Sequence, residues 1–180
     1  EMLGSVTSKV KELKRHIDHI IVVDGEGRVD DVIHFFELWE TSDVKNKEVL
    51  IIGLGHVGLT LGLVLADVGF KVSGYEIKSD LVKDINKGIV PFHEKGLSSL
   101  LKFHLSQGNF RAIDSLDHET ADIYMFSVGT PLGPNNQPIL SALEQSSKEL
   151  GPKLKKRDLV ILRSTVIIGT TRNVVVPILE

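Results

Sequence analysis

The residues in this chain best suited to chemistry are the glycines of the run Gly53-Leu54-Gly55-His56-Val57-Gly58. Their spacing is G-x-G-x-x-G, and the run stands between an apolar segment typical of a strand and a longer segment typical of a helix, as dinucleotide-binding loops do. In such loops the first glycine permits a tight turn, the second admits a pyrophosphate to the backbone, and the third allows close helix packing. The helix N-terminus then faces the phosphates. We therefore predict that residues 53–58 contact a dinucleotide; the alternative is an ordinary glycine-rich turn.

An acidic residue follows the loop at a suitable distance. Glu76 ends the segment Gly74-Tyr75-Glu76, about 20 residues beyond the glycines, where a carboxylate can accept hydrogen bonds from the adenosine ribose. Because a carboxylate repels a 2′-phosphate, this position favours NAD over NADP. Lys78 weakens the preference if its ammonium group attracts a phosphate, and has no effect on it if the side chain is simply solvated.

Two later segments place hydroxyl groups just after predicted strands. One is Ser127-Val128-Gly129-Thr130-Pro131-Leu132, and the other is Ser164-Thr165, which precedes Gly169-Thr170-Thr171. Open α/β sheets bind ligands at the carboxyl ends of their strands. We therefore expect a ligand to lie near Val128, Gly129, Thr130, Ser164 and Thr165, and we expect the Thr130 hydroxyl to orient a water or a substrate group. The alternatives are an ordinary loop at Thr130 and helix N-capping by Ser164 or Thr165.

The composition excludes several other classes of protein. A net charge of −3 gives no basic excess with which to bind nucleic acid. The chain has no cysteine, which excludes disulfides, thiolate metal sites and a cysteine nucleophile within it. Its seven histidines are scattered, so we expect no metal site. The early apolar run at residues 20–23 is too short for a signal peptide or a membrane span, so we expect a cytoplasmic protein with no membrane partner.

The elements that must position these residues follow an α/β pattern from residue 48 onward. Apolar runs alternate with amphipathic segments, which predicts a Rossmann-type doubly wound parallel sheet in the order β-α-β-α-α-β-β-α-β. The predicted strands are residues 49–53, 71–75, 110–113, 122–128 and 158–162. The predicted helices are residues 57–68, 79–87, 96–107 and 141–150. We expect Ser79 and Ser141 to cap their helices, and Gly69, Gly88 and Gly108 to end the preceding ones.

Residues 1–46 form a separate segment, predicted as a small α/β extension joined to a domain of residues 47–180. The pattern from about residue 5 to 40 predicts helix, strand (20–23), turn (24–27) and helix (29–39), followed by a polar linker. The segment faintly resembles one half of a CBS-type regulatory repeat; the alternative is a fold-stabilising or inter-domain extension. Because the chain starts with Glu1 and ends at Pro177-Ile178-Leu179-Glu180, we expect both ends to be cut from a longer protein.

Residues 47–180 resemble the NAD-binding domain of the UDP-glucose, UDP-N-acetylmannosamine and GDP-mannose dehydrogenases. Besides the segments above, the resemblance rests on Ile85-Asn86-Lys87-Gly88, Pro91-Phe92-His93-Glu94, Gly96-Leu97 and Pro138-Ile139-Leu140-Ser141. It implies a two-step oxidation of a sugar C6 alcohol to a carboxylate, with NAD as cofactor, a UDP-sugar as substrate and a cysteine thioester on the way. It also implies that Thr130 helps to position the active-site water, that Ser164 and Thr165 lie on the nicotinamide side, and that the full-length parent is a possible homo-oligomer.

The chain also departs from the family pattern. The family's nucleophilic cysteine, catalytic lysine and substrate-binding segments lie beyond residue 180, so we expect the fragment alone to be inactive. A catalytic glutamate that the family carries near Ser164 is not evident, and Arg163 and Arg172 stand nearby instead. Two alternatives therefore remain: a non-catalytic NAD-sensing or regulatory module, and a different hydride-transferring dehydrogenase of related architecture.

Overall fold

A computed structural model describes residues 19–23, 29–34 and 47–180. The chain divides into two units between Val44 and Lys45, and each unit is described by itself. In the first, β1 (His19–Val23) pairs antiparallel with β2 (Val29–His34), with His19 opposite His34 and an irregularity between Val22 and Val23.

The helix predicted for residues 29–39 is wrong over Val29–His34, which form strand β2. Apolar residues at helical spacing suggested a helix, but three of the six residues are β-branched and the preceding strand needs a partner for its backbone groups. The predicted strand at residues 20–23 is confirmed. The first predicted helix, the turn at residues 24–27, the end of the second helix and most of the linker lie outside the described residues.

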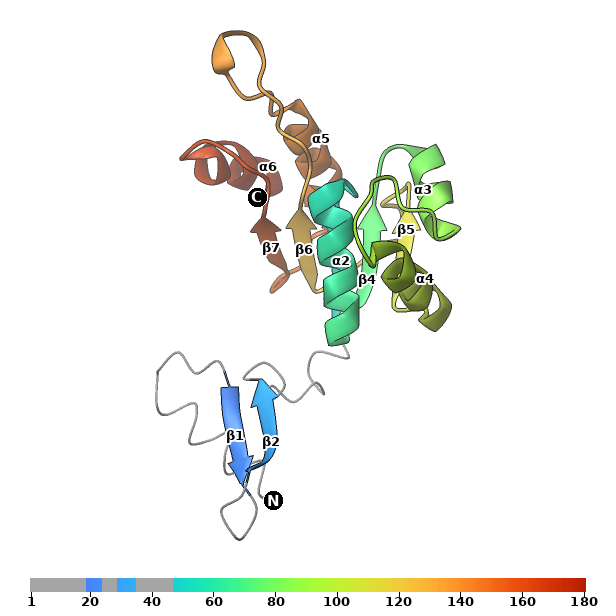
Figure 1. The fold of residues 1–180 in the computed structure, drawn as a ribbon. Helices are drawn as coiled ribbons and strands as arrows, with labels where there is room; N and C mark the ends of the chain where they lie inside the picture. Colours follow the sequence, from blue (N-terminus) through green and yellow to red (C-terminus); the bar gives the residue numbers. More distant parts are fainter. Residues whose placement is uncertain (1–18, 24–28, 35–46) are drawn as a thin grey trace. The chain divides into compact units, whose positions relative to one another are not determined.

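The second unit contains a five-stranded parallel sheet with the strand order β5-β4-β3-β6-β7. Its strands are β3 (Glu48–Ile52), β4 (Lys71–Tyr75), β5 (Phe110–Ile113), β6 (Ile123–Phe126) and β7 (Leu159–Leu162). The chain winds outward from β3 in one direction through β4 and β5, then in the other through β6 and β7 (Figure 1). The predicted doubly wound, Rossmann-type sheet is confirmed, and its switch point lies at the carboxyl end of β3.

Helices cover both faces of this sheet. They are α2 (His56–Val68), α3 (Ser79–Asn86), α4 (Leu97–Gln107), α5 (Ser141–Leu150) and α6 (Val176–Leu179), with a π-helical turn at Thr171–Val175 and 3₁₀ turns at Pro134–Asn136 and Gly151–Lys153. Val49 and Ile51 point into one core, with α2, α3 and α4, whereas Leu50 and Ile52 point into the other, with α5. This alternation along β3 is that of a strand buried on both faces.

The residues predicted to end helices are found where expected, whereas the residues predicted to cap helix starts are not. Gly69 and Gly108 end α2 and α4 in the left-handed conformation, as predicted. Ser79 and Ser141 are the first helical residues rather than caps; Lys78 and Leu140 occupy the cap positions and make no side-chain capping bond. The predicted N-caps were therefore placed one residue too far along the chain.

Candidate functional site

The glycine loop begins where β3 ends, and two of its glycines are required by packing. Gly53 has a φ of +97°, and its N–H donates to the Tyr75 carbonyl at 2.8 Å. A Cβ atom on Gly58 would lie 1.8 Å from the Gly53 carbonyl oxygen, so only glycine lets α2 start this close to the loop. These two residues fix the course of the backbone.

Gly55 differs, because a Cβ atom built there would meet no atom within 4 Å. It stands at the N-cap of α2, and its carbonyl accepts from the Leu59 N–H. Nothing in the fold requires glycine at this position, whereas a ligand approaching the backbone at the helix N-terminus would require it. This is the geometry that a pyrophosphate-binding loop needs.

Glu76 lies against the loop. Its Oε2 accepts from the Leu54 N–H at 3.1 Å, and its Oε1 accepts from the Lys78 N–H at 3.2 Å. The Leu54 side chain itself is buried in the core, where it packs over Gly74. The carboxylate is thus held beside the loop with lone pairs left for further donors, as the proposed role with a ribose requires.

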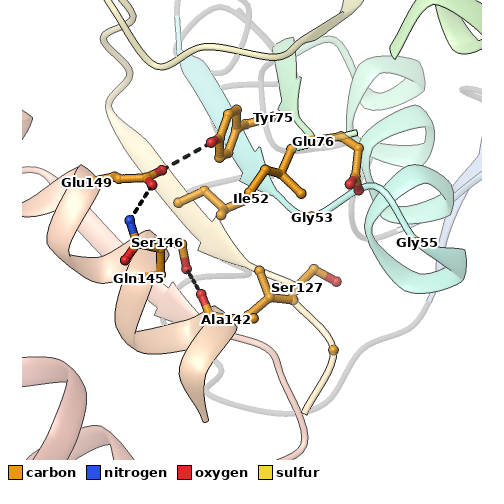
Figure 2. Close-up of a pocket in the computed structure, with 13 residues that line it drawn as sticks. Ile52, Gly53, Gly55, Tyr75, Glu76, Ser127, Ala142, Gln145, Ser146 and Glu149 are labelled. Carbon is orange, nitrogen blue, oxygen red and sulfur yellow. Dashed lines mark hydrogen bonds between the residues drawn. The ribbon is translucent and has the colours of Figure 1, made fainter. Parts of the chain in front are cut away.

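A cavity of about 280 Å³ adjoins the loop and lies between the ends of β3, β4 and β6 and one side of α5 (Figure 2). Five of the residues predicted from the sequence line it: Gly53, Gly55, Glu76, Val128 and Gly129. The hydroxyl of Ser127, another lining residue, is buried without a hydrogen-bond partner. An unpaired buried hydroxyl is costly unless a ligand or a water reaches it.

Other predicted residues lie outside the cavity lining. His56 and Val57 are exposed at the start of α2, where the His56 ring stacks on Phe92 with centroids 3.8 Å apart. Thr130 Oγ1 donates to the Thr165 carbonyl at 2.5 Å. The structure thus brings the loops after β6 and β7 together.

Ser164 contributes to the same junction. Its hydroxyl donates to the Val128 carbonyl at 2.7 Å. The next helical segment begins at Thr171 with Thr170 in the N-cap position and no side-chain capping bond. N-capping by Ser164 or Thr165, the alternative considered above, is therefore wrong, because Thr170 and not either of these residues stands at the N-cap position.

Sequence reasoning missed the polar residues on the α5 side of the cavity. Tyr75 Oη donates to Glu149 Oε2 at 3.1 Å, and Gln145 Nε2 donates to Glu149 Oε1 at 2.8 Å (Figure 2). Burial and the neighbouring Glu149 raise the pKa of Tyr75 to about 12, so the phenol remains a proton donor at neutral pH. The only signal for this group was the spacing of Gln145 and Glu149, which puts them one helical turn apart.

The residues present fit a dinucleotide. The loop offers bare backbone at a helix N-terminus, Glu76 offers a placed carboxylate, and the buried Ser127 hydroxyl lacks a partner. Within residues 19–23, 29–34 and 47–180, no group of three or more His, Cys, Asp or Glu side chains could hold a metal ion. No helix in these ranges is long and apolar enough to cross a membrane.

Fold and site together define a dinucleotide-binding Rossmann domain. The sequence profile of the UDP-glucose/GDP-mannose dehydrogenase family, NAD binding domain, matches residues 47–180. The chain therefore belongs to this family, and its α/β unit is the family's NAD-binding domain.

Known proteins of the family resemble the chain over the same region. The NDP-N-acetyl-D-galactosaminuronic acid dehydrogenase of Ralstonia nicotianae is 36% identical over 131 residues, which cover 73% of this chain and 30% of that protein. The UDP-N-acetyl-D-mannosamine dehydrogenase of Campylobacter jejuni is 38% identical over 128 residues, covering 71% and 31%. The crystal structure of a ternary complex of GDP-mannose dehydrogenase from Pseudomonas aeruginosa has a TM-score of 0.69 at 31% identity, covering 73% of this chain and 31% of that one. The chain thus spans about a third of the length of these relatives.

Proposed function

We propose that the α/β unit binds NAD through residues 53–58 and Glu76, and that it serves an enzyme oxidising the C6 alcohol of a nucleotide sugar to a carboxylate. The observation that carries the proposal is the contrast within the loop: Gly58 is required by packing, whereas Gly55 faces open space beside the Glu76 carboxylate. The names of the family relatives, all nucleotide-sugar dehydrogenases, support the substrate class. A UDP-sugar is our specific candidate.

Each part of the site has a distinct task in this proposal. The backbone amides at Gly55 and the start of α2 bind the pyrophosphate, and Glu76 accepts hydrogen bonds from the adenosine ribose. NAD, when bound, supplies the hydride acceptor for oxidation of the sugar carbon. The Glu76 carboxylate disfavours NADP because it would repel a 2′-phosphate.

The loops after β6 and β7 form the proposed nicotinamide side. Because Thr130 Oγ1 donates its proton to the Thr165 carbonyl, its lone pairs can accept a hydrogen bond from a water. Ser164 holds the Val128 carbonyl and so fixes the course of the loop that carries Gly129 and Thr130. We therefore propose a water-positioning role for Thr130 and a positioning role for Ser164 and Thr165.

Oxidation to the carboxylate needs more than this chain holds. A thioester cannot form here because the chain has no cysteine. We propose that the 180 residues bind NAD without turnover. A non-catalytic NAD-sensing role is the second candidate. The resemblance implies a catalytic glutamate near Ser164, but this chain has Arg163 and Arg172 there. Arginine is a poor proton acceptor, which favours the non-catalytic role.

Calorimetric titration of the 180-residue chain with NAD, NADH, NADP and a UDP-sugar tests the proposal. We expect binding of NAD and NADH, weaker binding of NADP, and no UDP-sugar binding. A folded chain that binds no dinucleotide would contradict the proposal. Complementing the chain with the remainder of a family enzyme would separate the two candidates, because only the catalytic one predicts NADH production from a UDP-sugar.

A further inference from the structure

The end of the cavity opposite the glycine loop is built from side chains rather than from bare backbone. Figure 2 shows Glu149 and Gln145 across the cavity from Gly55, with Tyr75 reaching toward Glu149. Tyr75 and Gln145 each donate a hydrogen bond to the Glu149 carboxylate. The Ser146 hydroxyl, also at this end, donates back to the Ala142 carbonyl of its own helix. None of these residues has a role in the function proposed above.

We propose that Glu149 and Gln145 read the adenine base of the cofactor, which would make this domain selective for adenine over other purines. In this arrangement Glu149 accepts a hydrogen from the adenine 6-amino group, and Gln145 donates its second amide hydrogen to the neighbouring ring nitrogen. The inference rests on the proposed binding of NAD at the glycine loop.

The direction of the cofactor places the base at this end. With the pyrophosphate at Gly55 and the ribose at Glu76, the base must lie beyond Glu76 in the cavity. The remaining lining on that side comes from Tyr75 at the end of β4, from Ile77 just after it, and from α5. A flat base would therefore meet the apolar surface of the cavity with its faces and the α5 side chains with its edge.

The Glu149 carboxylate is held in a fixed orientation, as a group that recognises a ligand donor must be. Its two oxygens receive one hydrogen bond each, from Tyr75 and Gln145, so the carboxylate is fixed from two sides. A carboxylate can accept about four hydrogen bonds, which leaves acceptor capacity on both oxygens. Facing a mostly apolar cavity, this capacity is best satisfied by a ligand N–H group.

The pair also has the polarity that distinguishes adenine from hypoxanthine. Adenine presents an amino donor beside a ring-nitrogen acceptor, which complements a carboxylate acceptor beside an amide donor. Hypoxanthine carries a carbonyl oxygen in place of the amino group. That oxygen would face the Glu149 carboxylate, so one hydrogen bond would be lost and two acceptors would oppose each other.

The test compares NAD with nicotinamide hypoxanthine dinucleotide in calorimetric titrations of the 180-residue chain. We expect NAD to bind roughly tenfold more tightly or better, the value of one hydrogen bond to a charged group. Glu149→Gln should bring the affinity ratio close to one, because its amide can turn to donate to the hypoxanthine oxygen. Glu144→Gln, the same change on the same helix outside the cavity lining, should leave the ratio unchanged.

The outcomes separate this inference from the proposed function. Equal affinities of the wild-type chain for the two dinucleotides, or an unchanged ratio in Glu149→Gln, would overturn the reading of adenine while leaving NAD binding intact. Failure of the folded chain to bind either dinucleotide would overturn both. If Glu149→Gln does not fold, the wild-type comparison alone still decides, because equal affinities contradict the inference.

Discussion

The two ends of the cavity achieve their shape in opposite ways. At the glycine loop the decisive feature is the absence of side chains. Without a Cβ atom, Gly53 and Gly58 let backbone segments of the fold approach one another, and Gly55 leaves the space beside the loop open for a ligand. At α5 the decisive feature is what the residues carry, a carboxylate oriented by Tyr75 and Gln145. The loop thereby defines the general class of ligand, a dinucleotide, whereas the α5 side chains define its base. The loop follows the Rossmann glycine pattern, whereas the polar group depends on side chains from β4 and α5.

The strongest test of the loop end is Gly58→Ala. Its Cβ atom would stand 1.8 Å from a backbone oxygen that cannot move without displacing β3, so the free energy of unfolding should fall by roughly 3 kcal/mol. Urea denaturation measures the change. Gly55→Ala is the matched control, and its stability should stay within about 0.5 kcal/mol of the wild type. Equal stability of the two variants would show that the loop is not packed as described.

The α5 end of the cavity, where Tyr75 contacts Glu149, is tested by raising the pH. Because the folded-state pKa of Tyr75 is about 12, above the usual value of 10.0, the stability it contributes is fully present below pH 10 and is lost as the pH rises toward 12. A shift of this size corresponds to roughly 3 kcal/mol once the pH has reached the folded-state pKa.

Unfolding measured at pH 9 and pH 11.5 should show this loss in the wild type and a smaller loss in Tyr75→Phe. Some loss should remain in the variant, because burial also raises the pKa of Tyr124. An identical pH dependence in both proteins would mean that Tyr75 is not buried against Glu149.

Glu76 connects the two ends, and its replacement tests cofactor choice. Glu76→Ser removes the charge that repels a 2′-phosphate, so the ratio of NAD affinity to NADP affinity should fall about tenfold, or 1.4 kcal/mol. Titration of both dinucleotides measures the ratio. Asp80→Ser makes the same change of charge on the exposed first turn of α3 and should not alter it. An unaltered ratio in Glu76→Ser would remove Glu76 from the site.

The smallest effect is expected where the loops after β6 and β7 meet. Thr130→Val removes one hydrogen bond to the Thr165 carbonyl and should lower the free energy of unfolding by about 1 kcal/mol. Ser164→Ala should cost a similar amount through the Val128 carbonyl. If the double variant loses less stability than the sum of the two single-variant losses, the two hydrogen bonds stabilise one shared loop arrangement; a fully additive loss would contradict this.

The difference between the two ends also explains what the sequence could predict. The glycine loop is a short contiguous motif, and the strand before it and the helix after it have clear patterns, so its place between β3 and α2 was predicted correctly. Tyr75 and Glu149 lie 74 residues apart, and only the order of the strands brings them together. A glutamate one turn from a glutamine on an amphipathic helix is otherwise read as a solvated pair.

The errors at the other elements have a similar origin. The segment Val29–His34 has apolar residues at spacings that fit a helix, and its strand form depends on pairing with β1 rather than on its own pattern. Ser164 had the residue type of an N-cap, but the next helical segment begins only at Thr171, and the Ser164 hydroxyl donates to the Val128 carbonyl. In both cases a partner distant in the sequence decided between two locally reasonable structures.

The most direct test of the central claim is the affinity for NAD of the wild-type chain and of Gly55→Val, measured by calorimetry on samples of matched stability. Because no atom lies within 4 Å of the added Cβ position, the variant should fold normally, yet its side chain should occupy the path of the pyrophosphate. We predict that NAD binds to the wild type and at least about tenfold more weakly to the variant. Undiminished binding by Gly55→Val, or no binding by the folded wild type, would contradict the account.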